Sequence, residues 1–227
     1  MKEEKDKANL QSVFFRPWIG ENYIQGINGK KLLILGESHI CGGCQGVCGD
    51  LSIDDKTCRD FTSKAVKTFL SYKNNETGIR FAGWMNTYTK FSNVFLNKQL
   101  SASETISFWN SILFYSYVQY STDRARVSPK QKEFSDSKNA FFEVLEAHQP
   151  DLIIAWGNRL WEQLPSGGYY KKLENNEQTR INDGKGFYYY KTKEKDIPIM
   201  YVYHPSSSRF NYTSHDLIRE SLLKLER

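Results

Sequence analysis

The stretch KKLLILGESH, residues 30–39, decides the fold. Its first part, KKLLIL at residues 30–35, follows the turn-prone pair Asn28 and Gly29 and ends at Gly36. A short apolar run that is bounded by turn residues is typical of a strand buried on both faces. Because strands of this kind occur in parallel sheets that helices cover, the stretch predicts an α/β fold.

Further apolar runs alternate along the chain with segments of helical periodicity. Strands are expected in the second half of 107–119, at 151–156 and at 199–203, with 187–191 pairing near the sheet edge. Helices are expected at 60–72, 86–96, 133–148, 159–164 and 215–225. This alternation predicts a mostly parallel sheet with helices on both faces. The segment Ser166–Gly186, rich in Gly, Asn and charged residues, is expected to be a surface excursion.

Composition narrows the class of protein. With 227 residues, of which 39% are hydrophobic, the chain can bury one core, and we expect a single domain over residues 1–227. No stretch approaches the roughly 20 consecutive apolar residues that span a bilayer, so no membrane association is expected. The charged N-terminus lacks an apolar signal segment, which favours the cytoplasm. We also expect a monomer.

The charge and the aromatic content are compatible with a nucleic-acid partner. A formal net charge of +5 permits an anionic partner without demanding one. Aromatic residues make up 15% of the chain, and they can either stack on bases or simply pack in the core. Both interpretations of the aromatic residues stay open at this point.

Two residues that follow predicted strands have side chains suited to catalysis. In sheets of this kind the ligand crevice lies beyond the carboxyl ends of the strands. Glu37 follows the first strand and His204 follows the last, which predicts that a carboxylate and an imidazole share one crevice. The alternative is that both residues cap neighbouring helices or lie in solvent.

A polar loop follows the last strand. Pro205 gives a rigid turn, and the small hydroxyl side chains of Ser206, Ser207 and Ser208 let a backbone approach a phosphate closely. Arg209 then adds a positive charge. The pattern favours a contact with a nucleic-acid backbone, and an ordinary polar loop is the alternative.

Four motifs together resemble the uracil-DNA glycosylase superfamily. They are LLILGES at 32–38, ARVSP at 125–129, DLIIAWG at 151–157 and YVYHPSSS at 201–208. The likeness spans roughly residues 31–208, and H-P-S is its most specific motif. The resemblance implies a three-layer αβα sandwich around a central, mostly parallel four-stranded sheet. It also implies hydrolysis of the N-glycosidic bond of a base that has been flipped out of DNA.

Site residues follow from the resemblance position by position. Gly36 and Glu37 match the first two residues of the G-E-A-P-G motif, and His204 matches the histidine of H-P-S. The resemblance implies that Glu37 orients or activates water and that His204 stabilises the departing base. The implied substrate-binding residues are Gly36, Ser38, His39, Ser116, Gly157 and Asn158. The implied DNA-binding residues are Pro205, Ser206, Ser207, Ser208 and Arg209.

The sequence departs from the superfamily at three of these positions. Ser38 stands where the best-known members have Asp, and His39 stands where most branches have Pro. Ser116 falls where many members have an Asn that recognises uracil, and a hydroxyl lacks the paired carbonyl and amide of that side chain. The base specificity therefore stays open. The candidate substitutes for the Asn are Tyr115, Tyr117 and Gln119.

All cysteines of the chain lie in one loop, at 41–58. They are Cys41, Cys44, Cys48 and Cys58, with the spacing C-x2-C-x3-C-x9-C. Four thiolates at loop spacing can close a tetrahedral metal site, and a disulfide framework is not expected in a reducing compartment. Iron–sulfur members of the resembled superfamily take their ligands from separated positions, so this local cluster favours structural zinc. An iron–sulfur cluster and free thiols are the alternatives.

These observations lead to one main hypothesis and two alternatives. We expect a DNA N-glycosylase that acts on a flipped base, uracil or a damaged one. A non-catalytic nucleic-acid-binding protein on the same fold is the first alternative, favoured by the residues at Ser38 and Ser116. An enzyme that acts on free nucleosides or nucleotides is the second. The presence of both Glu37 and His204 favours the glycosylase.

Overall fold

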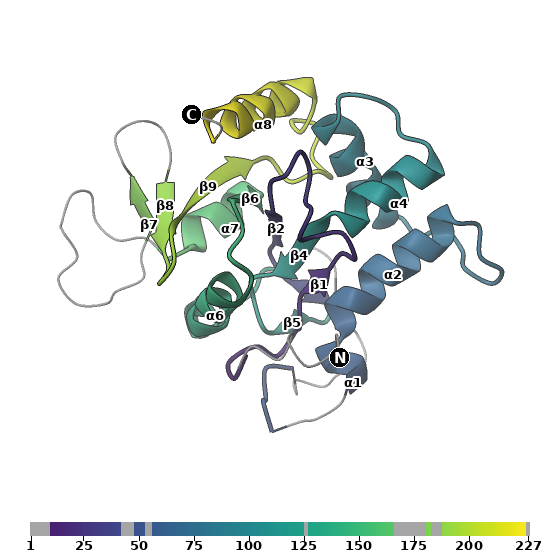
Figure 1. Cartoon of the computed structure of the whole chain (residues 1–227). Helices are drawn as coiled ribbons and strands as arrows, with labels where there is room; N and C mark the ends of the chain where they lie inside the picture. The colour runs from purple at the N-terminus through teal and green to yellow at the C-terminus, as the bar shows by residue number, and fades with distance from the viewer. Residues whose placement is uncertain are drawn as a thin grey trace, which may run out of the picture.

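The computed structural model describes residues 10–41, 48–52, 56–124, 127–165, 180–182 and 188–225. Figure 1 shows the arrangement of its helices and strands. The strands are β1 (Trp18–Ile19), β2 (Leu32–Gly36), β3 (His39–Ile40), β4 (Ile112–Ser116), β5 (Ser121–Thr122), β6 (Leu152–Trp156), β7 (Arg180–Asn182), β8 (Tyr188–Lys191) and β9 (Asp196–Val202). The helices are α1 (Lys56–Arg59), α2 (Phe61–Lys73), α3 (Met85–Phe95), α4 (Ala102–Asn110), α5 (Gln131–Asp136), α6 (Lys138–His148), α7 (Asn158–Gln163) and α8 (Tyr212–Lys224).

One large sheet organises the molecule. Over the described residues it has seven strands, in the order β1-β4-β2-β6-β9-β8-β7. The four strands β4, β2, β6 and β9 run parallel to their neighbours in this group, and the edge strands pair antiparallel. The expected α/β class and mostly parallel sheet are therefore confirmed. The sheet is wider than the expected four strands because short antiparallel strands extend both edges.

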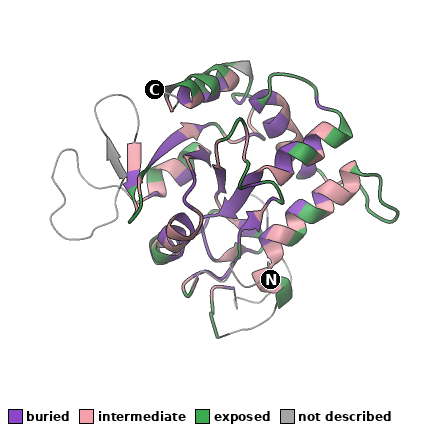
Figure 2. Ribbon diagram, viewed as in Figure 1, coloured by how far each residue is buried: buried purple, intermediate pink, exposed green. Residues whose placement is uncertain are grey.

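The side chains of β2 explain why both faces of the sheet are covered. Leu32 and Ile34 enter one core cluster, whereas Leu33 and Leu35 enter the other, as the period-two alternation of a strand requires. Helices α2, α3, α4 and α8 contribute to the first cluster, and α5, α6 and α7 contribute to the second. Figure 2 shows the buried strands at the centre, with exposed residues on the outer sides of the helices.

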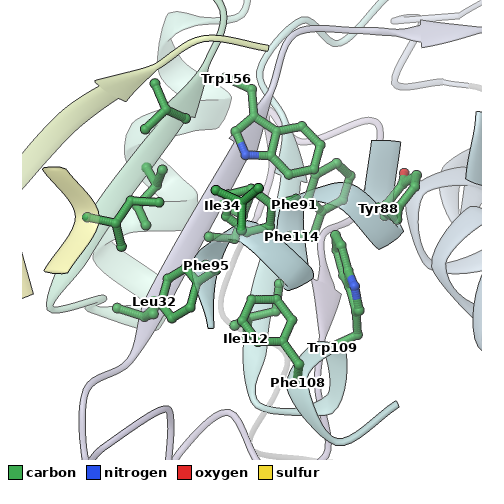
Figure 3. Packing of buried hydrophobic residues seen from close by; sticks show 14 of the residues in the cluster. Leu32, Ile34, Tyr88, Phe91, Phe95, Phe108, Trp109, Ile112, Phe114 and Trp156 are labelled. Atoms are coloured by element: carbon green, nitrogen blue, oxygen red, sulfur yellow. The ribbon is translucent and has the colours of Figure 1, made fainter. Parts of the chain in front are cut away.

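Aromatic rings dominate the first core cluster, as Figure 3 shows. Phe91 is fully buried, and its ring centroid lies 4.8–6.4 Å from those of Phe108, Trp109, Trp156 and Phe210. These edge, tilted and stacked contacts add to the free energy of burial. Packing therefore accounts for a large part of the aromatic content, which was one of the two interpretations left open by the composition.

Several boundaries differ from the sequence-based expectations. The strand expected in the second half of 107–119 ends at Ser116, because its register follows that of β2 and ends opposite Gly36. Helix α4 precedes that strand and starts at a capping box on Ser101 and Glu104. The edge strand expected at 187–191 is present as β8. Most of the expected surface excursion at 166–186 lies outside the described residues. Among the residues that the structure describes, no helix is long and apolar enough to cross a membrane.

The aromatic cluster predicts a large difference between two phenylalanine variants. Phe91→Ala is expected to lower the free energy of unfolding by about 3–5 kcal/mol, because it leaves a cavity among rings that cannot fully collapse. Phe81 is 53% exposed, and Phe81→Ala is expected to change the same quantity by less than about 0.5 kcal/mol. Urea unfolding of both variants checks the pair. Two small, equal changes would contradict the role given to Phe91.

Candidate active site

A cleft of about 320 Å³ opens at the carboxyl ends of the parallel strands. Glu37 follows β2, Gly157 and Asn158 follow β6, and His204 follows β9, and all four residues line it. The rest of the lining comes from Ser38, Ile40, Thr122, Val127, Trp156, Arg159 and Leu160. The structure thus brings Glu37 and His204 to the same cleft although they are far apart in sequence.

Gly157 shapes the floor of the cleft. Its φ of 95° lies in the region that favours glycine, and a Cβ there would lie 3.4 Å from the Cβ of His204. Its N–H donates a hydrogen bond to the carbonyl of Val202 at 2.8 Å. The glycine therefore lets α7 begin directly after β6, which places Asn158 and Arg159 at the cleft.

Arg159 fixes the carboxylate of Glu37. Its Nε donates to Oε2 of Glu37 at 2.7 Å, and its Nη2 donates to Oε1 of the same carboxylate. Its Nη1 donates to the Oγ of Ser128, so all three guanidinium nitrogens are engaged. The Glu37 side chain is 14% exposed and that of Arg159 is 51% exposed. A bidentate pair of this kind holds the carboxylate in one orientation while its remaining lone pairs can still accept from water.

The hydrogen bonds of His204 define its tautomer. The backbone N–H of Ser206 donates to Nδ1 of His204 at 3.2 Å, and the Oγ of Ser206 lies 2.7 Å from the same nitrogen. Because Nδ1 accepts from a backbone N–H, the neutral ring carries its proton on Nε2. Trp156 packs against the imidazole in a T-shaped contact with ring centroids 5.9 Å apart. The ring is therefore held in place with Nε2–H as its donor.

Burial lowers the pKa of His204 below the usual value of 6.5. The carboxylate of Glu37 acts in the opposite direction and raises this pKa, whereas the charge of Arg159 lowers it. Because burial has the largest effect, the imidazole is neutral at neutral pH. A neutral imidazole can donate a hydrogen bond to a group that becomes negative without first losing a proton.

A second, aromatic pocket of about 340 Å³ adjoins the cleft. Ser38 and Ile40 line both, and Phe61, Trp84 and Tyr88 form the aromatic part of the second pocket. Burial raises the pKa of Tyr88, so its hydroxyl stays protonated and can donate a hydrogen bond. The aromatic pocket can therefore accept a planar ring next to Glu37 and His204.

The side chains of two expected substrate-binding residues make packing contacts, although His39 also lines the aromatic pocket. The ring of His39 is buried between Phe15 and Phe61, with ring centroids 4.8 and 4.9 Å away, and its Nε2 lies 2.8 Å from the Oγ1 of Thr62. Burial lowers the pKa of His39 to about 3. Ser116 is buried opposite Gly36 in the sheet and does not line the cleft.

The candidate substitutes for the missing Asn are also committed elsewhere. The side-chain carbonyl of Gln119 accepts from the backbone N–H groups of Phe14 and Phe15, both at 2.8 Å. Tyr115 and Tyr117 are buried in the second core cluster. These contacts hold the chain that precedes β1 against the β4–β5 connection, and they leave base recognition to other residues.

The loop after β9 is tied to helix α3. Lys90 donates from Nζ to the backbone carbonyl of Ser207 at 2.6 Å, and the hydroxyl of Ser207 accepts from the backbone N–H of Arg209 at 3.2 Å. Pro205 is buried, and Ser206, Ser208 and Arg209 are exposed. The loop therefore presents polar groups to solvent at the cleft while Lys90 restrains its backbone.

The cysteine loop is described in part. Cys44 lies outside the described residues, as does Arg126 of the ARVSP motif. Cys48 accepts from the hydroxyl of Ser121 at 3.1 Å, and the backbone N–H of Cys41 donates to the carbonyl of Thr122 at 2.8 Å. Cys48 and Cys58 both belong to the small cluster around Phe14 and Phe15. Within the part of the chain that is described, no group of three or more Cys, His, Asp or Glu could hold a metal ion.

Sequence reasoning missed Arg159, Trp84 and Tyr88 as site residues, and it included Ser128 only as part of the ARVSP motif. Arg159 is the third residue after the end of β6, so inspection of that strand end could have included it. Its pairing with Glu37 spans 122 positions of sequence and has no local signal. Trp84 is the N-cap residue of α3, and Tyr88 lies within this helix and belongs to the first core cluster together with Phe91 and Phe95.

Comparisons with known proteins add no family to this picture. No protein-family model matches the chain, and no curated protein matches it. The fold and the cleft define a candidate active site of an α/β protein, and the functional argument depends on the geometry of that site.

The charges around His204 predict how its pKa responds to substitution. Glu37→Gln removes the charge that raises this pKa and is expected to lower it, whereas Arg159→Gln removes a charge that lowers it and is expected to raise it. NMR titration of the histidine Cε1–H resonances in both variants and in the unchanged chain measures the shifts. Shifts in the same direction for both variants would contradict the arrangement described here.

Proposed function

We propose that this chain is a DNA N-glycosylase with the three-layer αβα sandwich of the uracil-DNA glycosylase superfamily. The observation that carries the proposal is that a fixed carboxylate, Glu37, and a neutral imidazole, His204, line the same cleft. The parallel strands in the order β4-β2-β6-β9, with helices contributing to a core cluster on each face, support the sandwich.

In the proposed reaction water attacks the sugar carbon that bears the base. A bond forms between the water oxygen and C1′ of the sugar, and the glycosidic C1′–N bond breaks with its electron pair leaving on the base. Glu37 orients this water and accepts its proton, while Arg159 keeps the carboxylate in position. His204 donates from Nε2 to the base as negative charge develops on it.

The aromatic pocket is the proposed place for the flipped base. Phe61 and Trp84 offer apolar ring surfaces, and Tyr88 offers a hydroxyl donor for an acceptor atom of the base. Ser38 lines both this pocket and the cleft, so its hydroxyl can contact a nucleotide that spans them. Because Ser116 and Gln119 are committed to the core, the proposal keeps the base open, with uracil and damaged bases as candidates.

One observation favours the alternative of a nucleic-acid-binding protein without catalysis. Neither Ser116 nor any of its candidate substitutes lines the cleft. Oligonucleotides that carry uracil or damaged bases, as single strands and as duplexes, distinguish the hypotheses when they are tested beside free nucleosides. Release of a base supports the glycosylase, release from nucleosides alone supports the second alternative, and binding without release supports the first.

We propose further that the cysteine loop binds one zinc ion through Cys41, Cys44, Cys48 and Cys58. The described part of the loop supports this because Cys41 and Cys48 both contact β5, and Cys58 shares a cluster with Cys48. Thiolates are the ligands that structural zinc sites use. Zinc would link α1, which contains Cys58, to the loop that follows β3, and it would take no part in the hydrolysis.

Protein purified under reducing conditions is expected to contain about one zinc per chain, because four thiolates make a complete tetrahedral site. Cys48→Ser is expected to reduce the zinc content and the thermal stability together, since metal binding contributes to folding. Elemental analysis with thermal unfolding checks both. Iron with a brown colour would support the alternative cluster, and a metal-free chain that is fully folded would contradict metal binding.

His204→Ala is expected to lower the rate of base release by about a hundredfold or more while changing stability little. A hydrogen bond that forms to charge developing in the transition state is worth around 3 kcal/mol. Single-turnover release and thermal unfolding are measured on the same preparations. The matched variant is His215→Ala, because His215 lies on α8 and hydrogen-bonds the carbonyl of Phe95 at 3.0 Å, away from the cleft. Equal rates for the two variants would remove His204 from the mechanism.

A further inference from the structure

A row of aromatic side chains lies beside the cleft and has no part in the proposed hydrolysis. It consists of Tyr188, Trp161, Tyr201 and Tyr203, and we call it the aromatic row. Successive ring centroids are 5.4, 5.9 and 5.5 Å apart. The first three members come from β8, α7 and β9, which lie side by side in Figure 1, and Tyr203 directly follows β9.

One end of the aromatic row lies one residue along the chain from the cleft lining. Tyr203 directly precedes His204, and the guanidinium of Arg209 lies 5.6 Å from the centre of the Tyr203 ring. This distance suits a cation–π contact, in which the arginine keeps its charge available to an anion. A nucleotide chain that enters the cleft at His204 would therefore meet the ring of Tyr203 and the charge of Arg209 next.

The burial of the row differs from that of the core aromatic residues. Tyr203 is 39% exposed, and the other three members are partly exposed. Trp161 and Tyr188 pack against the second core cluster without being enclosed by it. All members are Tyr or Trp, which combine an apolar ring with a polar atom, so the row suits a partner that has both flat rings and polar groups.

We propose that the aromatic row is a stacking platform for the unpaired bases of single-stranded DNA, which continues from the target base in the cleft. Bases of every sequence have a flat face that can stack on an aromatic ring, and Arg209 supplies a charge for the backbone phosphates. In duplex DNA the bases already stack on one another, so the row favours the single strand. The inference deepens the proposed function and rests on it for the place of the target base.

Binding is measured without any excision, so that the inference can fail or succeed independently of the glycosylase. The anisotropy of a fluorescein-labelled oligothymidylate is followed as protein is added, beside a duplex of the same length. We expect the chain to bind the single strand more tightly than the duplex, with an affinity that falls as salt is added. Equal or tighter binding of the duplex would overturn the inference.

Variants of the row identify its contribution. Tyr203→Leu is expected to weaken binding of the oligothymidylate about tenfold, which corresponds to about 1.4 kcal/mol, and Tyr203→Phe is expected to retain it because the ring is kept. Trp161→Leu is expected to weaken it similarly. Phe81→Leu changes an exposed aromatic residue on the α2–α3 connection, at the side of the molecule opposite β8 in Figure 1, and is the matched control.

The outcomes separate the competing explanations. Affinity that is unchanged in Tyr203→Leu and Trp161→Leu, with both variants folded by circular dichroism, would overturn the inference. Self-association that the same two variants abolish, measured by sedimentation, would overturn it in favour of an interface between copies of the chain. Row-dependent binding without base release from any substrate would support the platform while the proposed hydrolysis failed.

Discussion

Strand β2 has no side that faces solvent, and the candidate site depends on this constraint. β4 and β6 pair with its two edges, and its side chains alternate between the two core clusters. The strand pairs with β4 over Leu32–Gly36 and with β6 over Leu32–Leu35, which fixes its register. The chain can leave the sheet only at Gly36, and Glu37 is the first residue to do so. The carboxylate is therefore placed by the core rather than by a flexible loop.

The electrostatics of the cleft follow from that placement. Glu37 interacts with two neighbours. Arg159 binds its carboxylate directly, and the negative charge of Glu37 also raises the pKa of His204. Arg159 and Glu37 change the pKa of His204 in opposite directions, so burial decides the outcome and the imidazole stays neutral. A cleft with one carboxylate, one guanidinium and one neutral imidazole can hold a water molecule and a hydrogen-bond acceptor without an unpaired buried charge.

The sequence was sufficient to predict the central strands, but it did not predict the short strands β1 and β7 or the long-range side-chain contacts. Residues 32–36 and 152–156 are continuous apolar runs, and this pattern identifies a strand buried on both faces. The ends of the first strand and of the last, expected at 199–203, then predicted that Glu37 and His204 share a crevice. Strands β1 and β7 are too short to have a pattern of their own, and their pairing depends on the sheet that is already formed. The engagement of Gln119 with Phe14 and Phe15 is a tertiary contact over more than 100 positions, which no local signal reports.

Helix α3 connects two parts of the site through residues that are close in sequence. Tyr88 lines the aromatic pocket, and Lys90 holds the loop that follows His204. The two residues are separated by about 3 Å along the helix axis, given the rise of an α-helix. One helix therefore carries both the residue that lines the pocket and the residue that holds the loop, so the two parts of the site share one rigid support. A displacement of α3 would therefore move the pocket wall at Tyr88 and the loop anchor at Lys90 together.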